Sequence, residues 1–307
     1  MTFFEIYDKI KSDFKDEEKI MKCNICPRKC NIDRKFEKGF CKSDDKIKIS
    51  RASLHYWEEP CISGKNGSGT VFFCGCNLGC VFCQNKKISR GENGKYVTSD
   101  ELSDIFLKLQ NEKANNINLV TPTHYTPYII PAIEKSINNG LTIPFVYNCG
   151  GCESVETIKS LKEKIQIYLP DFKYWDNSYS KKYSYFENYR DTAIKAIEEM
   201  VRQVGSPKIN KNKIMEKGVI VRHLVLPYLE EDSKKIIEYL YKTYKDDIFI
   251  SIMSQYTPPK DIKYNELKYP VRDYQYNEIV DFALSLGIKN AYIQDGESVG
   301  ESFIPDF

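Results

Sequence analysis

Cysteines are the residues of this chain that are best suited to chemistry. The chain has eleven in 307 residues, and nine of them lie between positions 23 and 83. An odd number of cysteines in a chain with no recognisable export signal is not typical of a disulfide framework. In a reducing compartment, clustered thiols are more often metal ligands or reactive groups. The first question is therefore which metal they would hold.

Three of these cysteines, Cys76, Cys80 and Cys83, are separated by three and then by two residues. Three thiolates so close in sequence can hold three irons of a 4Fe-4S cluster, because soft thiolates suit iron–sulfur sites. The fourth iron would keep an open coordination position, which usually means reactivity. A structural zinc site is the alternative, but zinc knuckles combine two separated pairs of ligands. The spacing therefore favours a reactive iron–sulfur cluster.

A second group of cysteines lies nearer the N-terminus. Its four members fall within nineteen residues: Cys23, Cys26, Cys30 and Cys41. Four thiolates suffice to close a tetrahedral zinc site or to ligate a second iron–sulfur cluster, and sequence spacing does not separate these metals. We expect a second metal site of one of these two kinds, with unliganded thiols as the third alternative.

Alternating apolar runs and helical stretches must position these groups. The expected strands are 70–74, 118–120, 143–147, 166–169, 219–226, 248–253 and 291–294, and the expected helices are 99–112, 131–138, 154–162, 184–204, 231–245 and 276–286. Strands that are apolar almost throughout and alternate with helices indicate βαβ units and a parallel sheet. The predicted fold is α/β, a partial (β/α)6 TIM-like barrel in residues 61–307. Residues 1–60 would form a small N-terminal Cys-rich segment with a helix over residues 5–21.

The polar residues with unusual chemistry follow the predicted strands. The cysteine triplet follows the first strand, and residues 121–125, 148–153 and 171–173 follow the next three. In such barrels the active site lies at the carboxyl ends of the strands. We therefore expect these residues to converge on one face.

Composition and charge exclude other classes. The net charge is only +2, which argues against a nucleic-acid partner. No apolar run approaches the ~20 residues of a membrane helix, and the N-terminal residues are charged throughout, unlike a signal peptide. These features predict a cytoplasmic protein with neither a nucleic-acid nor a membrane partner.

The triplet, together with its flanking residues Phe82, Gln84 and Asn85, resembles the radical S-adenosylmethionine (SAM) superfamily. Within it, the chain is most similar to the pyruvate formate-lyase activating enzyme and its relatives, on the stretches 58–85, 121–127 (TPTHYTP) and 168–176 (YLPDFKYWD). The resemblance implies that SAM chelates the open iron of a 4Fe-4S cluster. One electron from the reduced cluster would then cleave SAM, and the resulting 5′-deoxyadenosyl radical would abstract hydrogen.

The resemblance also implies a set of SAM contacts. It places Phe82 and Asn85 beside the cluster, Thr121, Thr123 and His124 near the SAM ammonium, Asn148 near the SAM carboxylate, and Glu153 near the ribose. Asp171 and Lys173 would form a SAM-contact pair in which Lys173 reaches the carboxylate, and Arg222 would reach the same carboxylate. The chain lacks the Glu that the family usually has after the second strand, so carbonyls or the Thr123 hydroxyl would have to bind the ammonium. His124 could equally be a buried, hydrogen-bonded histidine. For Cys149 and Cys152, two small buried residues are favoured over a redox or metal site.

By the same resemblance, the substrate would be a glycyl residue of a partner enzyme, and the electron donor a flavodoxin or a ferredoxin. Two alternatives stay open. One is a radical SAM enzyme that acts on a small metabolite, and the other is a non-catalytic iron–sulfur electron-transfer protein. The second leaves the polar residues after the strands without a purpose.

Overall fold

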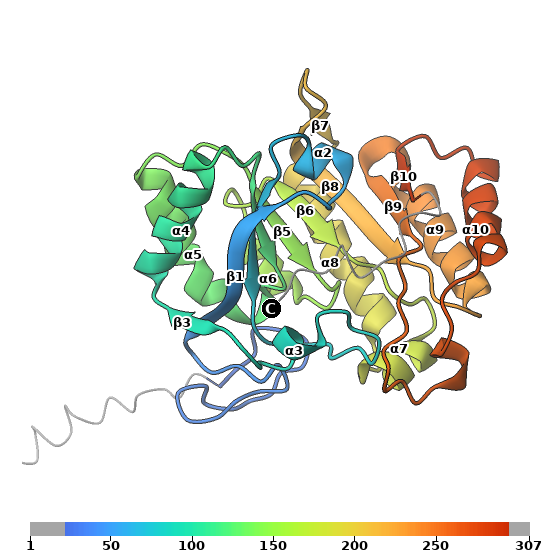
Figure 1. Cartoon of the computed structure of the whole chain (residues 1–307), viewed down its shortest axis with the longest axis horizontal. Helices are drawn as coiled ribbons and strands as arrows, with labels where there is room; N and C mark the ends of the chain where they lie inside the picture. The colour runs from blue at the N-terminus through green and yellow to red at the C-terminus, as the bar shows by residue number, and fades with distance from the viewer. Residues whose placement is uncertain (1–21, 295–307) are drawn as a thin grey trace, which may run out of the picture.

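The computed structural model describes residues 22–294, so the helix expected over residues 5–21 lies outside the described residues. The centre of the molecule is a curved sheet with the strand order β10-β9-β8-β6-β5-β4-β2-β1-β3 (Figure 1). Its parallel strands are β2 (Ser68–Phe73), β4 (Ile117–Val120), β5 (Phe145–Cys149), β6 (Ile167–Pro170), β8 (Met215–Leu224), β9 (Phe249–Met253) and β10 (Ala291–Ile293). Six crossovers connect these strands, which confirms the predicted partial (β/α)6 barrel.

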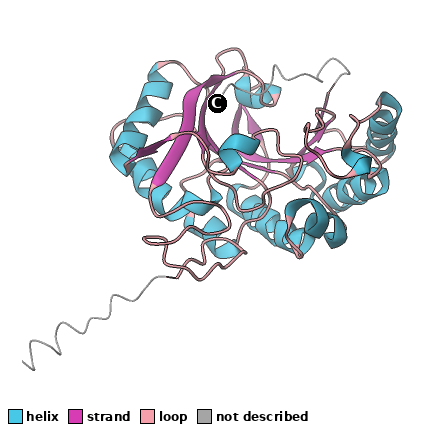
Figure 2. Cartoon of the chain, turned by 60° about the horizontal axis from the view of Figure 1, so that its bottom comes forward, coloured by secondary structure: helices cyan, strands magenta, loops and turns pink. Residues whose placement is uncertain are grey.

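Helices cover the outer side of the curved sheet (Figure 2). The longer ones are α4 (Ser99–Asn111), α5 (Thr126–Asn138), α6 (Val155–Ser160), α7 (Asn177–Ser184), α8 (Tyr189–Val204), α9 (Glu230–Tyr244) and α10 (Asp273–Ser285). In α4, Thr98 and Glu101 form a capping box that fixes the helix start. The buried face of this helix includes Leu102, Phe106 and Leu109, at the spacing expected of an amphipathic helix. No helix within residues 22–294 is both long and apolar enough to span a bilayer.

The structure corrects the predicted helix over residues 184–204. Residue 184 ends α7, and α8 starts only at Tyr189. Between them Tyr185 has a φ of 54°, in the left-handed region that ends a helix, and its N–H donates to the carbonyl of Ser180. A tyrosine gives no sequence signal for this break, since glycine or asparagine is the usual residue there.

Three strands were not predicted. β1 (Ile47–His55) pairs antiparallel with β2, β3 (Lys95–Val97) extends that edge, and β7 (Lys208–Ile209) forms a hairpin with β8. β1 precedes the domain boundary expected at residue 60 but forms part of the barrel sheet. Antiparallel edge strands are exposed on one side, so they lack the continuous apolar run that marks the central strands.

The segment after β1 closes one end of the barrel. It contains the short helix α2 (Pro60–Ser63), and Cys61 and Ile62 from this helix pack with Val146, Ile167 and Leu169 from the strands. These contacts lie at the end opposite the cysteine triplet. The Cys-rich segment before β1 lies at the other end, below α3 (Lys86–Ser89) in Figure 1. The barrel interior between these two ends is the region that positions the site.

Candidate active site at the carboxyl ends of the strands

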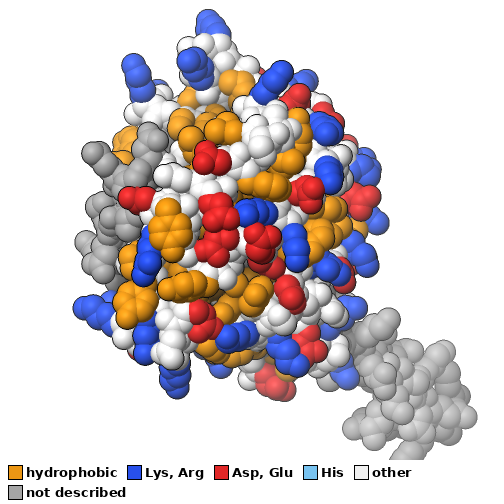
Figure 3. All heavy atoms as spheres, turned by 90° about the vertical axis from the view of Figure 1, so that its right-hand side faces the viewer, with side chains coloured by type: hydrophobic (Ala, Val, Ile, Leu, Met, Phe, Trp, Pro, Cys, Tyr) orange, Lys and Arg blue, Asp and Glu red, His pale blue; other side chains and the backbone are white. Residues whose placement is uncertain are grey.

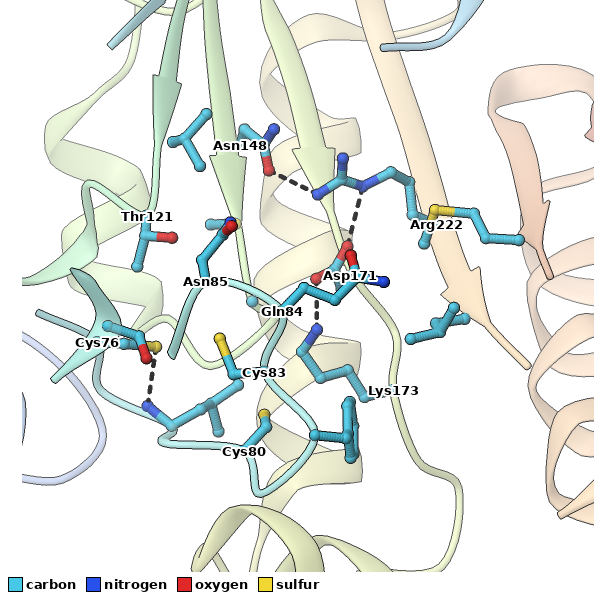
Figure 4. A pocket seen from close by; sticks show the side chains of 18 of the residues that line it. Cys76, Cys80, Cys83, Gln84, Asn85, Thr121, Asn148, Asp171, Lys173 and Arg222 are labelled. Atoms are coloured by element: carbon cyan, nitrogen blue, oxygen red, sulfur yellow. Dashed lines mark hydrogen bonds and ion pairs between the residues drawn. The ribbon is translucent and has the colours of Figure 1, made fainter. Parts of the chain in front are cut away.

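A cavity of about 250 Å³ opens at the carboxyl ends of the parallel strands. Figure 4 shows the cysteine loop on one side and polar side chains from β5, β6 and β8 on the other. Of the residues predicted for the site, the lining includes Cys76, Cys80, Phe82, Cys83, Asn85, Thr121, Asn148, Asp171, Lys173 and Arg222. Positions up to 146 residues apart in sequence thus meet in one cavity, as expected for βα loops of a barrel.

The cysteine loop is held against the N-terminal segment. Gly75 has a φ of 92°, and a Cβ there would lie 2.5 Å from the carbonyl oxygen of Cys41, so only glycine fits. The next residue, Cys76, donates its backbone N–H to the same carbonyl at 3.2 Å. Arg28 adds a guanidinium that donates to the carbonyls of Asn77 and Leu78. The N-terminal segment therefore forms one wall of the loop that carries the triplet.

The sulfur atoms of Cys76 and Cys80 have polar neighbours. The N–H of Leu78 lies 3.4 Å from the Cys76 sulfur, and the Ser184 hydroxyl donates to the Cys80 sulfur at 2.9 Å. Burial and the neighbouring Cys80 and Cys83 raise the pKa of the Cys76 thiol to about 12. A thiol with so high a pKa becomes a ligand only when a metal displaces its proton.

The opposite wall is a chain of alternating charges. The Lys173 ammonium pairs with Asp171, whose other oxygen accepts from Arg222 Nε at 2.9 Å. Arg222 also donates to the side-chain oxygen of Asn148 at 2.6 Å. The cationic neighbours hold the pKa of Asp171 below its usual range, although burial acts in the opposite direction. Both cations are therefore held in fixed positions facing the cavity.

Glu58 completes this wall, and the sequence analysis did not select it. It lies between β1 and α2, accepts from Asn118 at 2.9 Å and lies 3.3 Å from Arg222 Nη1. It begins the stretch 58–85 that carries the resemblance, but its role was not predicted, because the strand residues that it contacts, Asn118 and Arg222, are far away in sequence. The one available signal was the pair of adjacent acidic residues, Glu58 and Glu59, within an otherwise turn-like stretch.

Thr121 shows backbone strain at the cavity. Its φ of 59° is rare for a β-branched residue. Its N–H donates to the carbonyl of Asn148 at 2.8 Å, which ties the ends of β4 and β5 together. Phe82, on the cysteine loop, is buried against the rings of Tyr174 and Tyr256. The strained threonine and the packed phenylalanine both fix residues that line the cavity.

Three predicted contacts lie outside the cavity lining. The Thr123 hydroxyl donates to Glu153 at 2.9 Å, and His124 Nε2 lies 2.8 Å from the carbonyl oxygen of Cys74. All three side chains are at most 2% exposed. Burial lowers the pKa of His124 to about 3 and raises that of Glu153 to about 7. The buried, hydrogen-bonded histidine is the alternative that this geometry matches, whereas Glu153 accepts from Thr123 and also contacts the Cys149 thiol.

The Cys149 and Cys152 thiols are also buried. Cys149 ends β5 directly after Asn148 and is among the residues that line the cavity, although it is only 2% exposed. Burial and the neighbouring Glu153 raise the pKa of both thiols well above the usual value. Their burial matches the interpretation as two small buried residues.

The four N-terminal cysteines lie close to one another on the loop before β1. Cys26 and Cys41 are buried, whereas Cys23 and Cys30 are partly exposed. A Cβ on Gly39 would lie 3.3 Å from the Cys30 sulfur and 3.6 Å from that of Cys41. Within residues 22–294, no three His, Cys, Asp or Glu side chains are grouped as ligands of a single metal ion. The predicted second metal site therefore stays a prediction.

Fold and cavity together define a class: a partial (β/α) barrel that carries a three-cysteine loop at its strand ends. The sequence model of the radical SAM superfamily matches residues 70–240, more than half of the chain. The chain belongs to this superfamily, as its motifs predicted. Membership implies a 4Fe-4S cluster and SAM as cofactors.

Similar proteins agree with the assignment to the superfamily, but they do not identify a subfamily or a substrate. The chain is 31% identical to the uncharacterised protein MJ0674 of Methanocaldococcus jannaschii over 277 residues, which is 87% of this chain and 74% of that protein. Among solved structures, a radical SAM methyltransferase from Sphaerobacter thermophilus is 12% identical with a TM-score of 0.50, covering 74% of this chain and 66% of the other. A domain of a pyruvate formate-lyase activating enzyme from Bacteroides vulgatus is 13% identical with a TM-score of 0.40, covering 56% and 92%. Identities this low show the fold alone.

Proposed function

We propose that this protein is an enzyme that cleaves SAM reductively at a cluster held by Cys76, Cys80 and Cys83. One observation carries the proposal: the three cysteines line the same cavity as a wall of fixed charges from β6 and β8. An electron-transfer protein needs a cluster but has no use for such a wall. A SAM-cleaving enzyme uses both.

The residues present fit the two cofactors. Three thiols on one loop leave one iron of a 4Fe-4S cluster open, and hydrogen bonds from Leu78 and Ser184 would stabilise the sulfurs. When bound, the cluster and SAM supply the 5′-deoxyadenosyl radical chemistry of the superfamily.

The side chains that line the cavity would bind and orient SAM. Lys173 and Arg222 present positive charge toward the cavity, where they can bind the carboxylate of SAM. Thr121 and Asn85 add a hydroxyl and an amide group from two further elements. The barrel wall and the closing segment after β1 cover the cavity away from its opening, which would limit the access of water to reactive species.

The test is anaerobic reconstitution with iron and sulfide, followed by incubation with SAM and dithionite. The proposal expects 5′-deoxyadenosine and methionine in equal amounts, and no cleavage in protein that has not been reconstituted. A reconstituted cluster that accepts electrons but leaves SAM intact would support the electron-transfer alternative instead.

For the substrate, we propose a glycyl residue of a partner enzyme, as in the activating enzymes. The open edge of the sheet supports this proposal, because a barrel that does not close leaves a lateral route for a protein loop. A flavodoxin or ferredoxin would supply the electron. The second candidate is a small metabolite, because a cavity at the carboxyl ends of barrel strands is a usual site for small molecules.

Deuterium tracing separates the two substrates. A glycine-deuterated partner protein should transfer label to 5′-deoxyadenosine and show a glycyl radical by electron paramagnetic resonance. Label transfer from a free metabolite at full turnover, without a protein partner, would reject the glycyl substrate.

We further propose that the four N-terminal cysteines bind a second metal centre, either zinc or an iron–sulfur cluster. The other three thiols are close enough to Cys26 to raise its pKa, and the nearby Arg28 and Arg34 would offset thiolate charge. Metal analysis of a protein with Cys76, Cys80 and Cys83 all changed to Ala isolates this site. Zinc or iron should persist there and be lost when Cys26 and Cys41 are also replaced.

A further inference from the structure

Arg222 lies where oxygen atoms from three separate parts of the chain converge. Its guanidinium donates to Asp171 of the β6 end and to Asn148 of β5, at 2.9 and 2.6 Å. The third acceptor is Glu58, at 3.3 Å, from the segment between β1 and α2. The side chains of Arg222 and Asp171 are 15% exposed and that of Glu58 is 10% exposed. Figure 4 shows the dashed contacts of Arg222 with Asn148 and Asp171.

The third acceptor is held in place by the fold of the closing segment. The backbone N–H of Glu58 donates to Ser63 Oγ at 3.0 Å, and the N–H groups of Ile62 and Ser63 donate to the carbonyl of Glu59. Because Ile62 is fully buried in the barrel interior, the segment cannot swing away without exposing apolar surface. Glu58 is therefore inserted into the barrel from the end opposite the cysteine loop.

Charge balance makes these oxygens dependent on a cation. Burying the carboxylates of Glu58 and Asp171, with Glu59 beside them, would cost folding free energy unless a cation balanced their charge. Burial raises the pKa of Glu58 and of Glu59, and in both cases the positive charge of Arg222 is the largest influence that opposes burial. Lys173 neutralises only the far oxygen of Asp171.

We propose that the oxygens of Glu58, Asn148 and Asp171 form a receptor for one guanidinium group, which Arg222 fills from within the chain. Glu58 is then a positioning residue for Arg222. A guanidinium has five N–H groups, and these acceptors use three of them. The remaining two are available to a carboxylate in the cavity that Arg222 lines. The inference rests on the proposed function, since it takes that carboxylate to be the one of SAM.

The first test is chemical rescue of Arg222→Ala in reconstituted protein, with SAM affinity measured by equilibrium dialysis. Losing a buried charged contact should weaken SAM binding roughly 30-fold or more. Millimolar guanidinium chloride should restore most of that affinity and raise the melting temperature of the variant, whereas choline chloride at equal ionic strength should do neither. Arg222→Ala that binds SAM within about 3-fold of the wild type, or that is not rescued although it keeps its cluster absorption, would overturn the proposal.

The second test isolates Glu58, because a variant without Arg222 could fold poorly. Glu58→Gln keeps the size of the side chain and removes its charge. It should weaken SAM binding while keeping the cluster and, combined with Arg222→Ala, should lower the affinity for guanidinium. Equal SAM affinity in Glu58→Gln and in the wild type, with Arg222 present in both, would overturn its positioning role.

A third measurement separates this inference from the proposed function. Decarboxylated SAM lacks the group assigned to Arg222, so the penalty of Arg222→Ala should largely disappear with that ligand. A full penalty with decarboxylated SAM would overturn the assignment. Absence of SAM cleavage in the wild type would instead refute the proposed function itself.

Discussion

At the scale of single residues, pairing decides which buried polar groups stay charged. Asp171 is flanked by Arg222 and Lys173, and these two cations hold the pKa of its carboxyl below the usual range. Glu153 is just as buried but receives hydrogen bonds only from neutral groups, and one of its oxygens has no partner within the described residues. The two acids therefore behave differently at neutral pH, although sequence analysis assigned both to the same cofactor.

Glu153→Gln should stabilise the protein in a pH-dependent way. Burial raises the pKa of Glu153 to about 7, so the folded protein keeps a proton that the unfolded chain releases above its ordinary value of 4.5. This group therefore lowers stability as pH rises from 4.5 to 7, by about 3 kcal/mol in total. Thermal unfolding should show no gain for the variant at pH 4 and a clear gain at pH 8.

The same variant tests the role of Glu153 at the ribose. Since Glu153 lies outside the cavity lining, SAM affinity should change by no more than about 3-fold, which is less than the loss of one hydrogen bond produces. A loss of SAM binding without any change in pH-dependent stability would instead place Glu153 at the cofactor.

At the scale of elements, loops after the strands were predictable only where their residues carried a motif. The spacing of Cys76, Cys80 and Cys83 and the Asp171–Lys173 pair pointed to the correct strand ends, because parallel strands end at one face. That Thr123 and Glu153 bond to each other outside the cavity lining depends on the conformations of the loops after β4 and β5, which a short apolar run does not specify. Glu58 was missed because it follows β1, an edge strand that lacks the continuous apolar run of the central strands.

Gly151→Ala should disrupt the junction between β5 and β6. Gly151 has a φ of 77°, and a Cβ there would lie 2.1 Å from the carbonyl oxygen of Asp171. Strain of this kind costs roughly 1–3 kcal/mol, and the backbone that carries Asp171 must move. Thermal unfolding and SAM dialysis should both show a loss. The matched control is Gly140→Ala, at a φ of 96° with no atom within 4 Å, which should lose stability but keep SAM affinity.

Arg28→Ala should loosen the cysteine loop. Its guanidinium donates to the carbonyls of Asn77, Leu78 and Ser184, and unsatisfied buried carbonyls cost about 1–3 kcal/mol each. The reconstituted variant should release iron to a chelator several-fold faster than the wild type. Arg202→Ala, which removes an exposed guanidinium paired with Glu199, should leave the release rate unchanged. Equal rates for all three proteins would show that the N-terminal segment does not support the loop.

At the scale of the whole molecule, the central α/β architecture was predictable and the edges were not. The seven expected strands are all present, with bounds that differ by a few residues at most, because strands covered on both faces are apolar throughout.

The face on the α10 side presents hydrophobic side chains among acidic and basic ones (Figure 3). Tyr274 and Leu284 of α10 are both more than 60% exposed. A mixed surface of this kind does not choose between a protein and a small-molecule substrate, so that choice depends on label transfer.

The central claim is that the Cys76–Cys83 loop holds the cluster at which SAM is cleaved. The most direct measurement is the yield of 5′-deoxyadenosine from reconstituted Cys80→Ala, compared with wild type and with Cys74→Ala. Cys74 is a buried cysteine only two residues before Cys76, but it lies outside the cavity lining. The account predicts that Cys80→Ala forms no 5′-deoxyadenosine while Cys74→Ala keeps activity near that of the wild type. Sustained 5′-deoxyadenosine formation by Cys80→Ala would contradict it.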